Sequence, residues 1–420
     1  MKQKVKQIFR NQFLKNVSTL AFGTIISQAI VVGTSPILSR IYSEESFGIL
    51  SVFTSITVFF AVVSTGRYEL ALGLPESREK ATKIFKLILK IGLFVSVFYF
   101  FLIFLLKNIL SISDKTGFLS SGMEYFAPLY ILLIAVYSAC GYWQQRSKNY
   151  KQITIANAIQ VISATLFSVV FGLLHVETGL IIALIIGILS SNLYLLSKDK
   201  TLIRSLLQAT ELKSVAKEYS SFPRYMIFSD LSLTASQQFI PVLFSILFNS
   251  SIVGFYAMAN RLIRLPNIVI TSAIGNVFRN DAIDEIRING NCRILYMATF
   301  KKLTLMSIPI YIFVFFLSPT LFRLFLGEKW ETAGLFARIL SVMLMFEFVA
   351  VPLSTIFYIR KKQKLLARFQ FCNAVIGGIG IYLGSHFFHT PFASLIIFVF
   401  TSVIFNILLM VFSYKYSFHD

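Results

Sequence analysis

The sequence is short of charged side chains. Asp, Glu, Lys and Arg together make up 14% of the 420 residues, whereas a soluble domain carries about 25%. Apolar residues reach 56%, so the chain holds too few charges to cover the surface of a water-soluble protein of this length. The composition therefore predicts an integral membrane protein.

Residues that carry chemistry are scarce as well. The chain has four histidines and three cysteines, and Cys140, Cys292 and Cys372 follow no metal-binding or disulfide spacing. No Ser/His/Asp set, catalytic carboxylate pair or nucleotide-binding loop is visible. The connectors between apolar segments are too short for a domain that binds a second substrate. We expect no catalytic residues, no metal and no cofactor, and therefore a transporter rather than an enzyme.

Acidic residues are outnumbered by basic ones. The chain has 39 Lys and Arg against 19 Asp and Glu, a net charge of +20. In a soluble protein this excess would suggest a nucleic-acid partner. Here the basic residues lie mostly in short connectors, where they orient helices and meet anionic lipid headgroups. The expected partners are membrane lipids, and no nucleic acid is expected.

Long apolar runs divide the chain into helices that can cross a bilayer. Crossing a hydrocarbon core about 30 Å thick takes about 20 apolar residues, and membrane β-barrels show short alternating segments instead. We expect an all-α fold with six-helix bundles at residues 1–197 and 222–420, joined by a cytoplasmic connector at 198–221. The twelve predicted spans are Asn16–Ile41, Phe47–Leu72, Ala81–Leu106, Met123–Gln145, Ile153–Leu174, Gly179–Leu196, Phe222–Phe248, Ile252–Val277, Ile294–Leu317, Gly334–Tyr358, Leu365–Phe387 and Pro391–Tyr414.

The basic residues also predict the orientation. With the N-terminus in the cytoplasm, nearly all Lys and Arg fall in cytoplasmic connectors, as expected for twelve spans with both termini inside. Those on the opposite side are Arg40, Lys107, Lys115, Arg323 and Lys329. The first apolar run is too long for the core of a cleavable signal peptide, so we expect it to remain as an anchor.

The two halves resemble each other weakly. Compared at an offset of 206 residues, ILSRIYSEESFGILSVF and FSILFNSSIVGFYAMAN place Ser43 opposite Asn249 and Gly48 opposite Gly254. At an offset of 216 residues, RSKNYKQITIANAI and KKQKLLARFQFCNAV place Lys148 opposite Lys364. Because each half has six spans, these repeats are expected to be parallel, related by an axis along the membrane normal.

Charged residues within the spans are the candidates for function, since a charge at the centre of a membrane helix costs about 2.5–3.5 kcal/mol. Arg261 and Arg264 are three residues apart, hence on one face of the eighth span. Asn260 lies beside them, and Pro266 is expected to kink the helix. Two interpretations stay open: the arginines bind an anion in a wet cavity, or they pair with Asp230 or Glu347.

The seventh span is unusually polar for a buried helix, which favours the wall of a hydrated cavity over simple helix packing. Its polar residues are Arg224, Ser229, Asp230, Ser232, Thr234, Ser236, Gln237 and Gln238. The first span adds Gln28. The tenth span holds Arg338 and Glu347, which form either a helix–helix ion pair or cavity lining.

Arg67 and Glu69 end the second span. Residues two apart on an α-helix point about 200° apart, so we expect no ion pair between them. They are either interfacial anchors or flank the cytoplasmic mouth of a cavity.

Twelve spans in two halves, LSRIYSEESFGILSVF, RYELALGLP and LFGEKWETAGLFARIL together resemble the polysaccharide-exporting flippases of the multidrug/oligosaccharidyl-lipid/polysaccharide superfamily, specifically the O-antigen and capsule repeat-unit translocases (Wzx-type). The resemblance implies two bundles around a central cavity that opens alternately to each side of the bacterial cytoplasmic (inner) membrane. The implied cargo is an undecaprenyl-pyrophosphate-linked oligosaccharide, of the kind used for lipopolysaccharide, and the polymerase and chain-length regulator of the pathway are implied partners.

For that cargo, the substrate-binding candidates are Arg261, Arg264, Asn260, Arg224, Arg67, Gln237 and Gln28. The candidates for coupling or gating are Asp230, Glu347, Glu69 and Arg338. The alternatives are another exporter of the superfamily (a lipid II or teichuronic-type flippase, or a drug/cation antiporter) or a membrane polymerase or ligase. Excess mid-span arginine disfavours the antiporter, and the lack of a long outer loop disfavours the enzymes.

Overall fold

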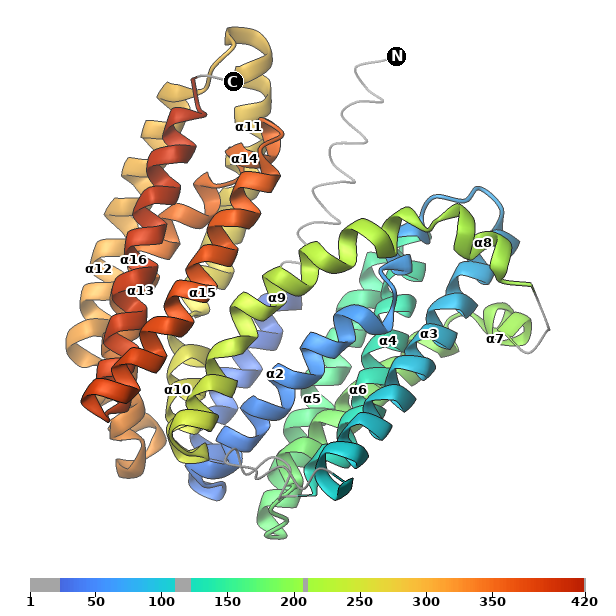
Figure 1. Ribbon diagram of the computed structural model, residues 1–420, viewed down its shortest axis with the longest axis horizontal. Helices are drawn as coiled ribbons and strands as arrows, with labels where there is room; N and C mark the ends of the chain where they lie inside the picture. The colour runs from blue at the N-terminus through green and yellow to red at the C-terminus, as the bar shows by residue number, and fades with distance from the viewer. Residues whose placement is uncertain (1–22, 110–121, 207–210, 419–420) are drawn as a thin grey trace. The chain divides into compact units, whose positions relative to one another are not determined.

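The computed structural model describes residues 23–109, 122–206 and 211–418 (Figure 1). The start of the first predicted span and Lys115 lie outside the described residues, as do the side chains of Ser229 and Ser236. Every regular element in the described ranges is helical. This follows from the composition, because in lipid a helix satisfies its own backbone hydrogen bonds.

Ten helices in the described part of the chain are long and apolar enough to cross a membrane. They are Gly23–Ile41, Glu44–Ser64, Arg78–Lys107, Met123–Arg146, Tyr150–Leu173, Gly179–Ser197, Arg293–Leu326, Glu328–Ile359, Gln363–Phe388 and Pro391–Lys415. The chain is therefore a multi-pass membrane protein.

Of the two remaining predicted spans, the seventh forms as expected and the eighth is not continuous. The seventh is one helix, α9 (Ser221–Leu247), in which Gln237–Leu247 is apolar. The eighth is broken: α10 (Ser250–Ile263) ends at Arg264, and a π-helical turn, Asn267–Thr271, precedes α11 (Ser272–Asn289). Pro266 lies in the break, where its missing N–H and its ring interrupt regular helix bonding.

The first compact unit comprises the described residues up to Tyr42 together with Phe53–Thr234. Within it, α3 packs on α4 and α5 packs on α6. Its elements are Gly23–Ile41, the later part of α2 (Glu44–Ser64), a 3₁₀ turn (Tyr68–Ala71), α3 (Arg78–Phe104), α4 (Ala127–Arg146), α5 (Tyr150–Leu173), α6 (Gly179–Ser197), α7 (Lys200–Leu206), α8 (Lys213–Glu218) and the first part of α9.

The second unit comprises Ser43–Val52 and Ala235–Asp420. Here α12 packs on α13, and α16 packs on both α13 and α15 (Figure 1). Its elements are the start of α2, the rest of α9, α10, α11, α12 (Arg293–Leu326), α13 (Glu331–Leu353), α14 (Ile356–Ile359), α15 (Gln363–Phe388) and α16 (Pro391–Lys415).

Backbone geometry supports the expected correspondence of Ser43 with Asn249. Ser43 Oγ accepts a hydrogen bond from the N–H of Ser46 at 3.2 Å, at the start of α2. Asn249 Oδ1 accepts one from the N–H of Ile252 at 2.9 Å, at the start of α10. Both residues therefore cap a helix N-terminus in the same way, three residues before the donor.

The expected correspondence of Lys148 with Lys364 is wrong by three residues. Lys148 and Lys361 share the left-handed conformation, with φ of 56° each. The next residues bond alike: Asn149 N–H donates to Gln144 O at 2.9 Å, and Lys362 N–H donates to Phe357 O at 2.7 Å. A shift of three residues is close to one helical turn, so letter matching within the helices could not detect it.

Candidate functional site

Arg264 is paired within the second unit. Its Nη1 lies 2.6 Å from Oε1 of Glu347 on α13, and its Nε donates to Oδ1 of Asn260 at 2.7 Å. About a third of the Arg264 side chain is exposed, 32%. Of the two carboxylates proposed as partners, Glu347 is the one that neutralises Arg264. A charge held this way contributes to helix packing as well as to any role in binding.

A buried polar cluster continues from this ion pair. Asn267, in the π-helical turn, donates from Nδ2 to the carbonyl of Leu344 on α13 at 3.4 Å. Its Oδ1 accepts a hydrogen bond from the hydroxyl of Tyr311 on α12, which is almost fully buried. These bonds connect three elements and hold the break between α10 and α11 in place. Nothing in the sequence analysis pointed to Tyr311, because a single tyrosine in an apolar helix carries no pattern.

Arg261 differs from Arg264. It lies on α10 one turn earlier and is partly buried. Among the described residues, no ion pair or hydrogen bond of its side chain occurs. A partly buried guanidinium with no carboxylate partner is able to receive an anion through its forked N–H groups.

In the first unit, Arg67 contacts two carboxylates. Its Nη1 lies 3.0 Å from Oε1 of Glu69, and its Nη2 forms an ion pair with Asp230 on α9. Glu69 is buried, and the side chains of Arg67 and Asp230 are about one-quarter exposed. The cluster has one positive and two negative groups. Arg67 Nε and Glu69 Oε2 have no hydrogen-bond partner among the described residues.

The expectation that Arg67 and Glu69 do not pair was wrong, because it assumed a continuous helix. Helix α2 ends at Ser64, and both Gly66 and Arg67 adopt the left-handed conformation with φ of 58°. A 3₁₀ turn, Tyr68–Ala71, follows. The reversal at Arg67 removes the 100° per residue rotation on which the expectation rested, so side chains two residues apart meet.

The other predicted residues are not brought into either cluster by a described contact. Gln28 is half-buried, and Arg224 and Gln237 are exposed. Arg338 donates from Nε to the carbonyl of Phe315 at 3.0 Å, and its guanidinium lies 6.0 Å from the centre of that ring. Arg338 therefore packs against α12 and, among the described residues, forms no ion pair with another helix.

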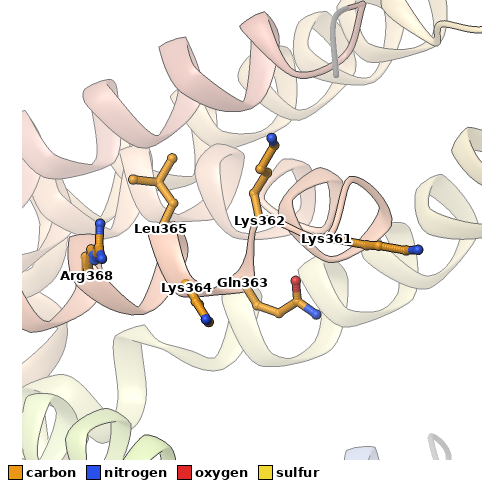
Figure 2. A pocket seen from close by; sticks show the side chains of 6 residues that line it. All are labelled: Lys361, Lys362, Gln363, Lys364, Leu365 and Arg368. Carbon is orange, nitrogen blue, oxygen red and sulfur yellow. The ribbon is translucent and has the colours of Figure 1, made fainter.

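The sequence analysis missed one basic pocket of about 720 Å³ in the second unit (Figure 2). It is lined by Lys361, Lys362, Gln363, Lys364, Leu365 and Arg368. A signal was available, because the chain contains no Asp or Glu between Glu347 and Asp420. These cations were counted only as evidence for orientation.

Two solved structures show the same fold. One, titled lipid II flippase MurJ in an inward closed conformation, has a TM-score of 0.71 and 16% identity, covering 94% of this chain and 87% of that one. The other is an inward-facing multidrug resistance MATE family transporter of the MOP superfamily. It has a TM-score of 0.70 and 14% identity, and the match covers 94% of this chain and 93% of that one. A search of curated protein sequences gave no match.

A family model described as "polysaccharide biosynthesis protein" matches residues 37–335. That range runs from the end of the first helix into α13 and includes Arg67, Asp230, Arg261 and Arg264. It covers more than half of the chain. The protein therefore belongs to this polysaccharide biosynthesis family, with the helical membrane fold that it shares with lipid II flippase and MATE transporter structures.

Proposed function

We propose that the protein translocates undecaprenyl-pyrophosphate-linked oligosaccharide repeat units, of O-antigen or capsule type, across the bacterial cytoplasmic membrane by alternating access. Family membership supports a role in polysaccharide biosynthesis, and the fold is one found in a lipid II flippase. In this proposal both termini are cytoplasmic, and the protein is a transporter with no catalytic residues.

The observation that carries the proposal is the state of Arg261. It is a partly buried cation on an interrupted helix and has no described carboxylate partner, whereas neighbouring Arg264 is neutralised by Glu347. A diphosphate would supply the missing anion, with two phosphate groups suited to forked guanidinium contacts. In this role Arg261 binds the diphosphate, while Arg264, Asn260 and Glu347 form a polar wall beside it.

We assign Arg67, Glu69 and Asp230 to coupling or gating. This cluster has one more carboxylate than it has cations, and Glu69 Oε2 has no hydrogen-bond partner among the described residues, so it would attract a coupling cation. The same observation favours a second candidate, a cation-coupled drug antiporter, over the remaining alternatives. Arg224, Gln237, Gln28 and Arg338 stay candidates for contacts with the sugar or the lipid.

The test is transport of a fluorescent polyprenyl-pyrophosphate oligosaccharide in proteoliposomes. Arg261→Ala should reduce the rate at least tenfold with unchanged protein insertion, whereas Arg261→Lys should retain part of it. Arg323→Ala, an arginine in the last turn of α12, is the matched control. Wild-type rates for Arg261→Ala would refute the diphosphate role. Export of cationic dyes without movement of the lipid would favour the antiporter.

A further inference from the structure

The pocket at residues 361–368 has an unbalanced positive charge. Four of its six lining residues are Lys or Arg, and none is acidic. Within the described residues, none of these four cations forms an ion pair with a carboxylate. Lys361, Lys364 and Arg368 are exposed. Lys362 lies 5.7 Å from the ring of Tyr416, a contact that leaves its charge unneutralised.

The turn that carries these cations is firmly anchored. Lys362 N–H donates to the carbonyl of Phe357, which is fully buried. Arg360, next to the pocket, donates to the carbonyl of Tyr416 at 3.1 Å and to that of Gly290 at 2.9 Å. Arg360 is thus used for structure, while the four pocket cations make no such bonds to backbone carbonyls of the described residues. The pocket is held in shape without using its own charges.

The residues that flank the pocket are of the kinds found at a membrane–water interface. Tyr358, three residues before Lys361, is 53% exposed, and exposed tyrosines are typical of the membrane interface. Phe371, three residues after Arg368, is 55% exposed on the apolar helix α15, and such a side chain is suited to contact with hydrocarbon. Figure 2 shows the labelled side chains around the turn and the first part of α15. Flexible lysine stems at this position can reach a headgroup.

The start of α15 adds to the positive potential. Lys362 occupies the N-cap position and supplies no side-chain hydrogen bond to the first turn. The helix is 26 residues long, and the partial positive charge of a helix N-terminus favours an anion. This contribution adds to the four side-chain charges, which are the main attraction.

We propose that this pocket binds a phosphate group carried by a membrane lipid, at the end of α15 that the charge distribution predicts to be cytoplasmic. The ligand is either an anionic phospholipid or a polyprenyl diphosphate, which present the same chemistry. The four cations exceed the negative charge of either headgroup, and an apolar tail would extend along α15. The site is separate from Arg261. Binding of an anionic phospholipid is independent of the cargo proposed above, whereas binding of a polyprenyl diphosphate rests on it.

The first unit supplies a matched control. The turn at Lys148 has the same backbone conformation as the turn at Lys361, and Lys148 and Lys151 occupy positions equivalent to Lys361 and Lys364. That turn has Asn149 in place of Lys362, and the Asn149 amide donates to Gln144 Oε1 at 3.1 Å. Removing two lysines from either turn changes the net charge of the protein equally. A difference in lipid binding between the two double variants therefore reports the pocket and not the general surface charge.

The experiment measures binding to the purified full-length protein in neutral detergent. Its three probes are short-chain phosphatidylglycerol, farnesyl diphosphate and inorganic pyrophosphate. The double variant K361Q/K364Q should weaken lipid binding about thirtyfold, from the contribution of each cation near a charged lipid. K148Q/K151Q should stay within about threefold of wild type. R368K should weaken lipid binding less than K361Q/K364Q, because lysine keeps the positive charge and only the forked N–H groups of the guanidinium are lost.

The tighter-binding lipid identifies the source of the phosphate. Equal weakening by the two double variants would overturn the proposal, as would a wild type that binds neither lipid. Pyrophosphate that binds as tightly as both lipids would also overturn it, because the site would then select a free anion. Thermal unfolding of each variant checks that these exposed substitutions leave the fold intact.

Discussion

Gly48 and Gly254 make reciprocal backbone contacts where the start of α2 crosses α10 in the second unit. A Cβ atom on Gly48 would overlap the carbonyl of Ser250, and one on Gly254 would overlap the carbonyl of Glu44. Each hypothetical Cβ would also lie 3.2 Å from the other glycine's backbone nitrogen. Residues 44 and 48 occupy positions equivalent to 250 and 254, so the contact is internally symmetric. Small residues allow membrane helices this close an approach.

We therefore expect Gly48→Ala or Gly254→Ala to destabilise the fold. The added methyl group would meet backbone and not a movable side chain, so the cost should reach the upper end of the about 1–3 kcal/mol typical of overpacking. Thermal unfolding of the purified protein measures this. Gly141→Ala in α4 is the control, since nothing lies within 4 Å of its Cβ position. Equal stability of the three variants would contradict the close crossing.

The Arg264–Glu347 pair should show strong coupling. Glu347→Gln leaves the guanidinium without its charge partner and should cost about 2 kcal/mol, below the range for fully buried pairs because both side chains are partly exposed. Arg264→Gln should cost a similar amount, and the double variant should cost less than the sum. A double-mutant cycle on unfolding midpoints measures the coupling. Additive costs would show that the two residues act independently.

The cluster of Arg67, Glu69 and Asp230 can be tested through the stability of charge variants. Arg67→Ala leaves Glu69 and Asp230 without the cation that they share, so the variant should be less stable than wild type. Adding Asp230→Asn should restore part of the loss, because it removes one of the two negative charges. Limited proteolysis and thermal unfolding report the order of stability. No recovery in the double variant would argue against the shared ion pair.

Asp199 lies between α6 and α7, outside the membrane-spanning segments, and contacts residues of three helices, α3, α4 and α7. It lies 2.7 Å from Arg78 and accepts hydrogen bonds from Trp143 Nε1 at 3.0 Å, from Thr201 and from the N–H of Leu202. Burial alone would raise the pKa of Asp199, but these hydrogen bonds and the charge of Arg78 outweigh it and lower the pKa below its usual value.

A lowered pKa predicts acid sensitivity. The stabilisation is fully present above the unfolded-state pKa of about 3.9 and is lost as pH falls through the lower folded-state pKa. Asp199→Asn should lower the unfolding temperature at pH 7, with a difference from wild type that shrinks below about pH 4. Fluorescence of Trp143, which contacts Asp199, reports the transition. Asp281→Asn, at an exposed position of α11, should show no such pH-dependent difference.

Much of the helix pattern was predictable because a bilayer imposes one simple requirement. The tenth, eleventh and twelfth spans were expected at Gly334–Tyr358, Leu365–Phe387 and Pro391–Tyr414, and the structure has apolar helices at Glu328–Ile359, Gln363–Phe388 and Pro391–Lys415. Apolar length alone determines such segments. The seventh span, expected at Phe222–Phe248, is the single helix Ser221–Leu247. The eighth was less predictable in form, because Pro266 interrupts regular helix bonding.

The candidate sites depended more on tertiary structure. Sequence reasoning selected Arg261 and Arg264 together on depth and charge, but only the packing of α13 against α10 neutralises one and leaves the other without a described partner. The prediction that Arg67 and Glu69 do not pair assumed a continuous α-helix, but the backbone at Gly66 and Arg67 is left-handed. Charge partners depend on which helices become neighbours, and no local pattern contains that information.

Two properties follow from the amino-acid sequence alone: the protein resides in a membrane, and it is built of helices, because burying apolar side chains in lipid is a local demand. Helix packing sets which carboxylate meets which arginine, which glycines cross, and which lysines gather around one pocket. Ion pairing and backbone contact are set by distances between segments far apart in the chain.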